Sequence, residues 1–191
     1  MAAEHEQGPA EPTLGLARVY LRTPAPADEA EFVSVMEESR EFHRLWASAP
    51  SDPERFAAYL SDLRRPDFEA RLVCRFTDDA ILGFFNLSQI TRGPVRSAYL
   101  GYAAAARYAG QGYMREAISQ VLYLAFRELR LQQLEANIQP ANTASIALAR
   151  RAGFRLMGYS PRYLKISGRW RDHQRWLLTA EEWQRSSGAA R

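Results

Sequence analysis

The spacing of hydrophobic and polar positions changes several times along the chain, and each change separates two predicted elements. Alternating positions predict strands, whereas apolar positions three and four residues apart predict helices. In the first half these patterns predict a strand, two helices and three strands over residues 17–22, 28–39, 53–63, 72–76, 81–90 and 95–103. Asp78-Asp79 and Gly93-Pro94 provide turns between the three strands, which predicts an antiparallel meander.

The second half begins with a longer helix and then alternates strands with one more helix. A helix, a strand, a helix and two final strands are expected over residues 113–129, 134–138, 142–152, 154–166 and 170–178. Asn142 is a favourable N-cap residue, and Gly153 is favourable just after a helix. This order predicts one mixed α/β domain with a central sheet flanked by helices.

The two ends of the chain differ in composition from the region between them. Residues 1–15 are rich in Ala, Glu, Pro and Gly without periodicity, which is typical of a flexible leader. Residues 186–191 have a similar character and predict a flexible tail. A length of 191 residues fits one domain, which we assign to residues 16–185.

Charge is distributed unevenly, although the formal net charge is only +3. Residues 1–95 hold 10 basic and 16 acidic residues, a net −6, and residues 96–191 hold 15 and 6, a net +9. This asymmetry indicates either an anion bound by the second half and a cation by the first, or two solvated faces of opposite sign. The small surplus gives no argument for direct nucleic-acid binding.

Cysteine content and the lack of long apolar runs exclude several classes of protein. Cys74 is the only cysteine, so neither an intrachain disulfide nor a cysteine-cluster zinc site can form. No apolar run approaches the roughly 18 residues of a membrane-spanning helix. The first residues are acidic where a signal peptide is basic and then apolar. We expect a cytoplasmic protein without a metal site, as a monomer or a homodimer.

Residues 100–117 run from the end of a predicted strand through a glycine-containing loop into a helix. The first N–H groups of a helix have no partner within it and lie at the positive end of its dipole. Such a helix start binds phosphate, and Gly110 and Gly112 let the backbone approach the oxygens, while Arg107 adds charge. An ordinary strand-to-helix connection is the alternative. Neither the dinucleotide-binding fingerprint nor the Walker pattern is present.

The pattern Arg107-x-x-Gly110-x-Gly112 resembles the loop that holds the pyrophosphate of acetyl-CoA in the GNAT acyltransferase superfamily. Residues 137–145 and 151–154 also resemble segments of this family. Within the family, residues 39–42, 99–102 and 168–173 resemble the RimJ/RimL-type ribosomal-protein N-acetyltransferases. The resemblance extends over residues 17–183. It implies the GNAT fold, an α/β fold with a mixed, mostly antiparallel central sheet.

The resemblance also implies roles for individual residues. The backbone of Leu100, Gly101 and Tyr102 would pair with the pantetheine arm and polarise the thioester carbonyl. The residues whose amides would hold the pyrophosphate are Arg107, Ala109, Gly110, Gln111, Gly112, Tyr113 and Met114. Asn137 and Asn142 would bind the pantetheine arm, although a purely capping role suits Asn142 at least as well.

Ser145 lies in the first turn of the predicted helix. Its hydroxyl would stabilise or protonate the departing thiolate with help from the helix dipole, and a solvated surface serine is the alternative. Relatives often carry a glutamate, a candidate base, where this chain has Met157. Either water relays the proton, or the base lies elsewhere. His43, Glu135 and His173 are then the candidates, although each is more commonly structural.

The implied function is transfer of acetyl from acetyl-CoA to a primary amine by direct attack in a ternary complex. The favoured acceptor is the α-amine of a protein N-terminus, as in ribosomal-protein alanine acetylation. The alternatives are a small amine (a polyamine, an aminoglycoside or an amino acid) and a non-catalytic acetyl-CoA-binding module. The residues expected to make the acceptor entrance negative are Glu37, Glu38, Glu41 and Asp52. Phe42 and Trp46 are candidates to pack against a peptide or in the core.

Overall fold

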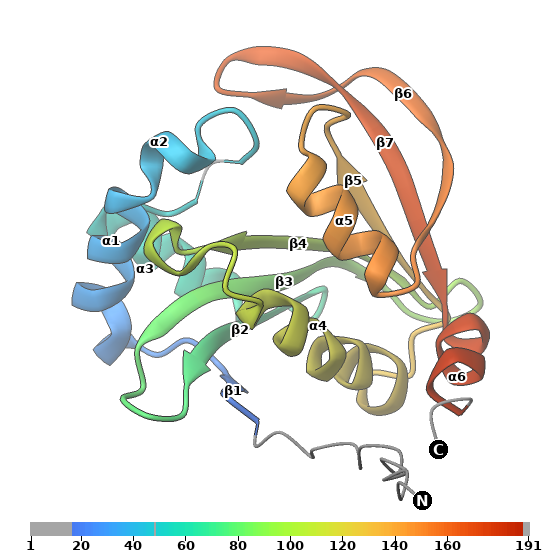
Figure 1. The fold of residues 1–191 in the computed structure, drawn as a ribbon, viewed down its shortest axis with the longest axis horizontal. Helices are drawn as coiled ribbons and strands as arrows, with labels where there is room; N and C mark the ends of the chain where they lie inside the picture. The colour runs from blue at the N-terminus through green and yellow to red at the C-terminus, as the bar shows by residue number, and fades with distance from the viewer. Residues whose placement is uncertain (1–16, 48, 189–191) are drawn as a thin grey trace, which may run out of the picture.

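A seven-stranded sheet with helices on both faces forms the part of the chain that the computed structural model describes, residues 17–47 and 49–188 (Figure 1). The strands are β1 Val19–Arg22, β2 Phe68–Arg75, β3 Ile81–Thr91, β4 Ser97–Ala104, β5 Gln133–Ile138, β6 Arg155–Ile166 and β7 Arg169–Thr179. The α-helices are α1 Glu29–Glu38, α2 Arg40–His43, α3 Pro53–Asp62, α4 Tyr113–Tyr123, α5 Thr143–Arg151 and α6 Ala180–Gly188. The strand order is β1-β2-β3-β4-β5-β7-β6, which confirms the predicted mixed α/β sheet.

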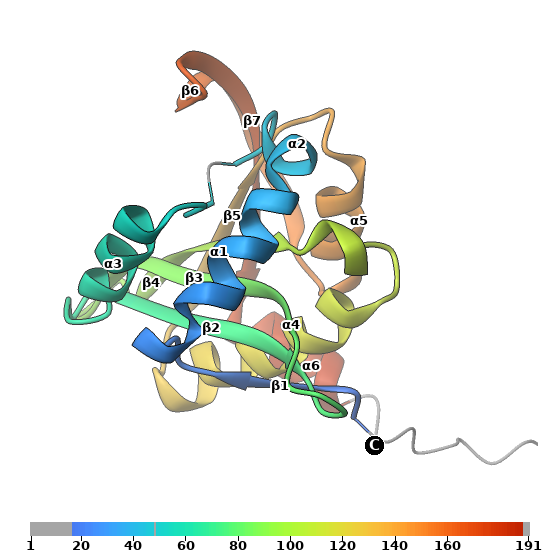
Figure 2. The same cartoon turned by 90° about the vertical axis from the view of Figure 1, so that its left-hand side faces the viewer.

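The two faces of the sheet bury separate hydrophobic clusters. On one face α1 and α3 place Phe32 and Phe56 against strand residues such as Leu72. On the other face α4 places Ile118 in the cluster that contains Leu134 of β5. Figure 2 shows α1 and α3 apart from α4, α5 and α6. The helix face with apolar spacing is in each case the face that packs on the sheet.

Strands β4 and β5 diverge soon after they meet. They form the parallel pair of the sheet, and their pairing covers only Ser97–Tyr99 of β4 against residues 133–135 of β5. Beyond this point β4 stays paired with β3 as far as Ala104, while β5 continues beside β7 as far as Ile138. A V-shaped gap therefore opens in the middle of the sheet, and Figure 1 shows the two strands separating. The strand predicted to carry Leu100 and its neighbours lies along this gap.

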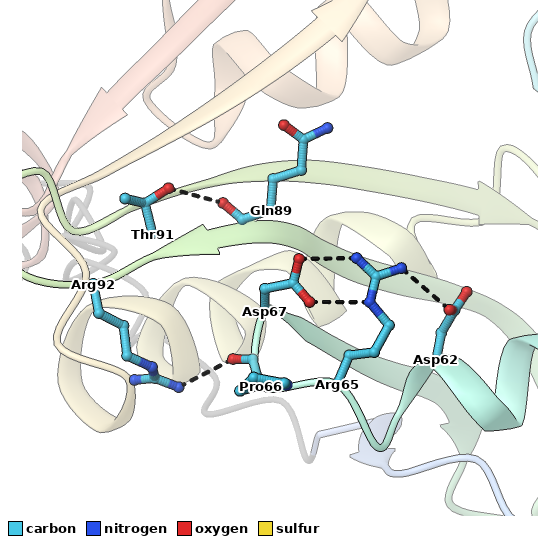
Figure 3. Close-up of polar contacts among 7 residues, drawn as sticks. All are labelled: Asp62, Arg65, Pro66, Asp67, Gln89, Thr91 and Arg92. Atoms are coloured by element: carbon cyan, nitrogen blue, oxygen red, sulfur yellow. Dashed lines mark hydrogen bonds and ion pairs between the residues drawn. The ribbon is translucent and has the colours of Figure 1, made fainter.

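The connection from α3 to β2 is fixed by charged side chains (Figure 3). The Arg65 guanidinium donates to both carboxylate oxygens of Asp67 at 2.9 and 3.0 Å and reaches Asp62 at 3.3 Å. Arg92 donates to the carbonyl of Pro66 at 3.4 Å from the far end of β3. These contacts hold the end of α3 beside the start of β2, which begins four residues earlier than predicted.

The long helix predicted over residues 113–129 changes its winding after Tyr123. From Leu124 to Glu128 the chain forms a π-helix, and Leu129 N–H donates to the carbonyl of Leu124 at 2.9 Å. The wider turn buries the consecutive apolar residues Leu124, Ala125 and Phe126 together. Regular α-helical spacing turns three adjacent side chains in different directions, so the sequence pattern alone did not predict the change.

Two short helices were also not predicted. Helix α2 follows α1 after a break at Ser39, whose hydroxyl donates to the carbonyl of Val35 at 2.7 Å. Helix α6 runs as far as Gly188 and so extends into the segment expected to be a flexible tail. The leader expected over residues 1–15, and residues 189–191 of the expected tail, lie outside the described residues.

Candidate active site

A cleft of about 570 Å³ lies between the end of β4, the loop that leads into α4, the first turns of α5 and helix α2. Nine residues predicted to act in the site line it: Tyr102, Ala109, Gly110, Gln111, Gly112, Tyr113, Met114, Asn142 and Ser145. The structure thus brings together the starts of α4 at Tyr113 and α5 at Thr143, which are far apart in the sequence. Four predicted residues, Leu100, Gly101, Arg107 and Asn137, are outside the lining.

The loop before α4 depends on two glycines with left-handed backbone. Gly110 has φ +77° and Gly112, the N-cap of α4, has φ +85°. Residues other than glycine rarely adopt this backbone conformation. A Cβ atom built on Gly110 would have no protein atom within 4 Å, so the space above this residue is open. The loop therefore presents bare backbone at the start of a helix, as a phosphate site requires.

The start of α5 is tied to β4 through Ser145. The Asn142 side chain accepts a hydrogen bond from Ser145 N–H at 3.1 Å, which confirms Asn142 as the N-cap. The hydroxyl of Tyr102 donates to the Ser145 carbonyl at 3.2 Å. Burial raises the pKa of Tyr102 to about 12, so this phenol stays protonated. Ser145 is half-buried in the cleft wall, where its hydroxyl lies at the positive end of α5.

Arg107 does not point into the cleft as an unpaired cation. It forms an ion pair with Glu38 of α1, so it links the loop to the helices on the opposite face. Arg115 of α4 and Arg151 of α5 line the cleft instead, and neither has a described carboxylate within ion-pair distance. Neither arginine was predicted to act in the site. Arg115 lies in the predicted helix that follows the loop, and Arg151 lies in the predicted helix over residues 142–152.

Asn137 of β5 lies just beyond the last residues that pair with β4. Its Oδ1 atom is buried and has no hydrogen-bond partner among the described residues. Buried polar atoms are nearly always paired in native proteins, and an unpaired one indicates a water or ligand position. Leu100 is buried within the sheet and Gly101 is exposed on it, both on the β4 side of the gap.

Helix α2 and the residues after it close the other end of the cleft with Phe42, His43 and Trp46. Two side chains from the opposite half of the sheet hold this segment in place. Gln139 donates to the carbonyl of Leu45 at 2.6 Å, and Ser167 in the β6–β7 turn donates to the carbonyl of Arg44 at 3.1 Å. The segment after α2 therefore connects the two sides of the gap between β4 and β5.

The negative entrance expected around this segment is largely compensated. Each of the four acidic residues lies within ion-pair distance of an arginine, in the pairs Glu37–Arg40, Glu38–Arg107, Glu41–Arg44 and Asp52–Arg55. Three of the pairs are spaced i,i+3, so the arginines come from the same short segments as the acids. No described Asp or Glu lines the cleft itself. The net charge of a long segment did not reveal this local pairing.

The three candidate bases lie in different surroundings. Glu135 accepts hydrogen bonds from Nε and Nη2 of Arg175, at 3.0 and 2.7 Å, and lines a separate hollow with Met157. His173 is buried in β7 with Nδ1 3.0 Å from the carbonyl of Arg171. His43 alone among them lines the cleft. Cys74 is fully buried in β2, as expected for a small hydrophobic residue.

The described residues contain no group of three His, Cys, Asp or Glu side chains that could hold a metal ion. A helix long and apolar enough to cross a membrane is likewise absent from residues 17–47 and 49–188.

Comparison with known proteins agrees with this geometry. Residues 18–155 match the family described as "Acetyltransferase (GNAT) domain". The chain is 30% identical over 164 residues to the probable N-acetyltransferase YjcK of Bacillus subtilis, which covers 82% of this chain and 91% of that protein. It is 37% identical over 103 residues to the [ribosomal protein uS5]-alanine N-acetyltransferase of Escherichia coli, covering 54% of this chain and about half, 53%, of that relative.

Solved structures show the same fold. Mycobacterium smegmatis RimJ in complex with CoA-disulfide has a TM-score of 0.80 at 25% identity, with 91% of this chain and 90% of that chain covered. The spermidine N-acetyltransferase of Vibrio cholerae in complex with CoA and spermine has a TM-score of 0.76 at 18% identity, with 88% and 99% covered. The chain therefore belongs to the GNAT acetyltransferase family and is an acetyl-CoA-dependent N-acetyltransferase.

Proposed function

We propose that this enzyme acetylates the α-amine of a protein N-terminus, with a ribosomal protein as the acceptor. The observation that carries this proposal is the 37% identity to the Escherichia coli uS5-alanine enzyme over 103 residues. The structural likeness to Mycobacterium smegmatis RimJ supports it. The reaction proceeds by direct attack of the amine, because the fully buried Cys74 offers no accessible thiol for an acyl-enzyme.

The cleft residues fit acetyl-CoA. Open space above Gly110 and the N-terminus of α4 suit the pyrophosphate, and Arg115 and Arg151 supply charge for the phosphates. The unpaired Oδ1 of Asn137, at the edge of the gap, suits an amide N–H of the pantetheine arm. When bound here, acetyl-CoA supplies the activated acetyl group.

Ser145 is the residue we propose to act on the leaving sulfur. Its hydroxyl lies in the first turn of α5, where the helix dipole stabilises negative charge. The bond between Tyr102 and the Ser145 carbonyl holds this turn beside β4. The amides of residues 100–102 along the gap complete the site by polarising the thioester carbonyl, as the family resemblance implies.

A polyamine acceptor finds less support in the cleft. The Vibrio cholerae spermidine enzyme shares the fold at 18% identity, which supports no further likeness. A polycation needs carboxylates near its ammonium groups, whereas no described carboxylate lines this cleft and the acids at its entrance are paired with arginines.

A CoA-release assay across amines tests the proposed acceptor. Short peptides that begin with Ala or Ser should be acetylated on the α-amine, as located by mass spectrometry. Because the entrance acids are compensated, kcat/KM should depend only weakly on salt and on Lys or Arg near the N-terminus. Turnover of spermidine, an aminoglycoside or a free amino acid with the peptides inert would refute the peptide acceptor. Binding of acetyl-CoA without turnover of any amine would indicate the non-catalytic module.

A further inference from the structure

Amine acetylation needs a group that takes a proton from the amine, and few groups in the cleft wall qualify. Its described lining contains no carboxylate. The guanidinium groups of Arg115 and Arg151 offer hydrogen-bond donors and no acceptor. Tyr102 is a phenol whose pKa burial raises to about 12, so it does not ionise near pH 7. His43 is the one imidazole among the described lining residues.

The geometry of His43 leaves one ring nitrogen available. Nε2 lies 2.8 Å from the carbonyl oxygen of Ala104 in β4. A carbonyl only accepts, so Nε2 carries the proton and donates it, which leaves Nδ1 with a lone pair. Nδ1 is buried and has no partner among the described residues, and the side chain as a whole is only 6% exposed. An unpaired buried acceptor destabilises the protein, and a donor that enters the cleft and bonds to it removes this cost.

Two neighbours of His43 differ in their surroundings: Ser39 is buried and anchored, whereas Phe42 is exposed. Ser39, one turn earlier, accepts a hydrogen bond from Ala106 N–H at 2.9 Å, so this segment is anchored both to the end of β4 and to the loop after it. Phe42 lies beside the imidazole, with the two ring centroids 5.4 Å apart, and is itself 47% exposed. A substrate reaches the buried Nδ1 only if neighbouring side chains move, and exposed side chains such as Phe42 change rotamer on a picosecond to nanosecond timescale.

We propose that His43 is the general base of the acetyl transfer, with Nδ1 receiving the amine proton. The amine lone pair forms the new bond to the acetyl carbonyl carbon, and the C–S bond breaks with its electron pair on sulfur. The surplus proton on nitrogen passes to Nδ1, and sulfur takes one proton through the Ser145 hydroxyl. Solvent resupplies that hydroxyl and removes the imidazolium proton. The assignment rests on the proposed placement of the reaction in this cleft, and it holds for any acceptor amine.

The surroundings keep His43 neutral at pH 7. Burial is the largest cause that lowers its pKa below 6.5, and the bond to Ala104 opposes this in part. The charged groups on the elements around it are the pairs Glu38–Arg107, Glu41–Arg44 and Glu37–Arg40, with Arg115 and Arg151 along the cleft. The phenol of Tyr108 lies on the loop. As pH falls through the lowered pKa, Nδ1 becomes protonated and kcat should fall.

The pH dependence of kcat in His43→Gln tests the proposal. Glutamine keeps an N–H donor for the Ala104 carbonyl but cannot take a proton near neutral pH. With saturating acetyl-CoA and the best amine of the panel, we expect kcat at pH 7.5 to fall about 100-fold. The acid limb of the wild-type profile should disappear, and acetyl-CoA affinity should change less than about threefold. Ser39→Ala, which removes the other anchor without a titrating group, should keep the limb.

Several outcomes would overturn the assignment. These are unchanged kcat in His43→Gln, reduced kcat with the same acid limb, or loss of the limb in Glu135→Gln instead. Should His43→Gln not fold, NMR titration of the wild type decides, because the chain has only three histidines. The His43 pKa must then match the kinetic limb. If peptides are not acetylated, the same test is carried out with another amine that is. If acetyl-CoA binds outside the cleft, Gly110→Val should keep the rise in Tm that acetyl-CoA causes.

Discussion

Replacement of Gly110 by valine should have two effects that can be measured independently. It should strain the backbone of the loop, which lowers the Tm of the free enzyme, and it should block the proposed binding of acetyl-CoA. At φ +77° any L-residue costs about 1–2 kcal/mol. For a protein of this size that corresponds to a fall in Tm of the free enzyme of about 2–8 °C. The new side chain itself meets no protein atom within 4 Å of its Cβ, so no steric clash within the protein adds to the strain.

Gly93 provides the matched control for this strain. It has φ +75° in the turn between β3 and β4, and a Cβ there also has no protein atom within 4 Å. It is not part of the cleft lining. Gly93→Val should therefore lower the Tm of the free enzyme by a similar amount and leave acetyl-CoA binding intact.

Thermal unfolding with and without acetyl-CoA gives the answer. At a ligand concentration 100 times Kd, binding stabilises the native state by about 2.7 kcal/mol, which raises Tm by roughly 5–11 °C. Wild type and Gly93→Val should both show this rise, whereas Gly110→Val should not. A full rise in Gly110→Val would refute the placement of the pyrophosphate at this loop.

Two further variants probe the start of α5. Ser145→Ala should lower kcat about 10- to 100-fold with nearly unchanged acetyl-CoA affinity, because a general acid acts in the transition state; full kcat would assign the step to water or another group. Asn142→Ala should lower the free energy of unfolding by about 1 kcal/mol through loss of the cap to Ser145 N–H. Asn142→Ser restores a capping oxygen, so it should recover this stability, and any KM increase for acetyl-CoA that persists in it measures the ligand contact of the amide. If Asn142→Ser restores both quantities, the residue only caps the helix.

Features encoded by a few neighbouring residues could be predicted from the sequence. The predicted N-cap at Asn142 is confirmed, and Gly110 and Gly112 lie in the predicted loop before the helix, where the structure gives both a positive φ. The spacing of apolar positions likewise predicted the strands and the main helices. The winding change at Leu124 was missed, because three adjacent apolar residues carry no period of their own.

Contacts between distant segments could not be predicted in this way. No local pattern indicated that Arg107 pairs with Glu38, 69 residues away. The prediction of a negative entrance did not consider that Glu37, Glu41 and Asp52 each pair with an arginine three residues later. His43 was one of three candidate bases, and only the fold shows that it alone among them lines the cleft.

The short pairing of β4 with β5 also affects the mechanics of the molecule. The sheet consists of two leaves, one of β1, β2, β3 and β4 and the other of β5, β7 and β6, joined by the three residue pairs between β4 and β5. Fluctuations that widen the V are resisted by side-chain ties such as Gln139 to Leu45, rather than by a continuous ladder. A molecule bound to both leaves acts as an additional tie, so deuterium uptake should slow on both sides of the gap together.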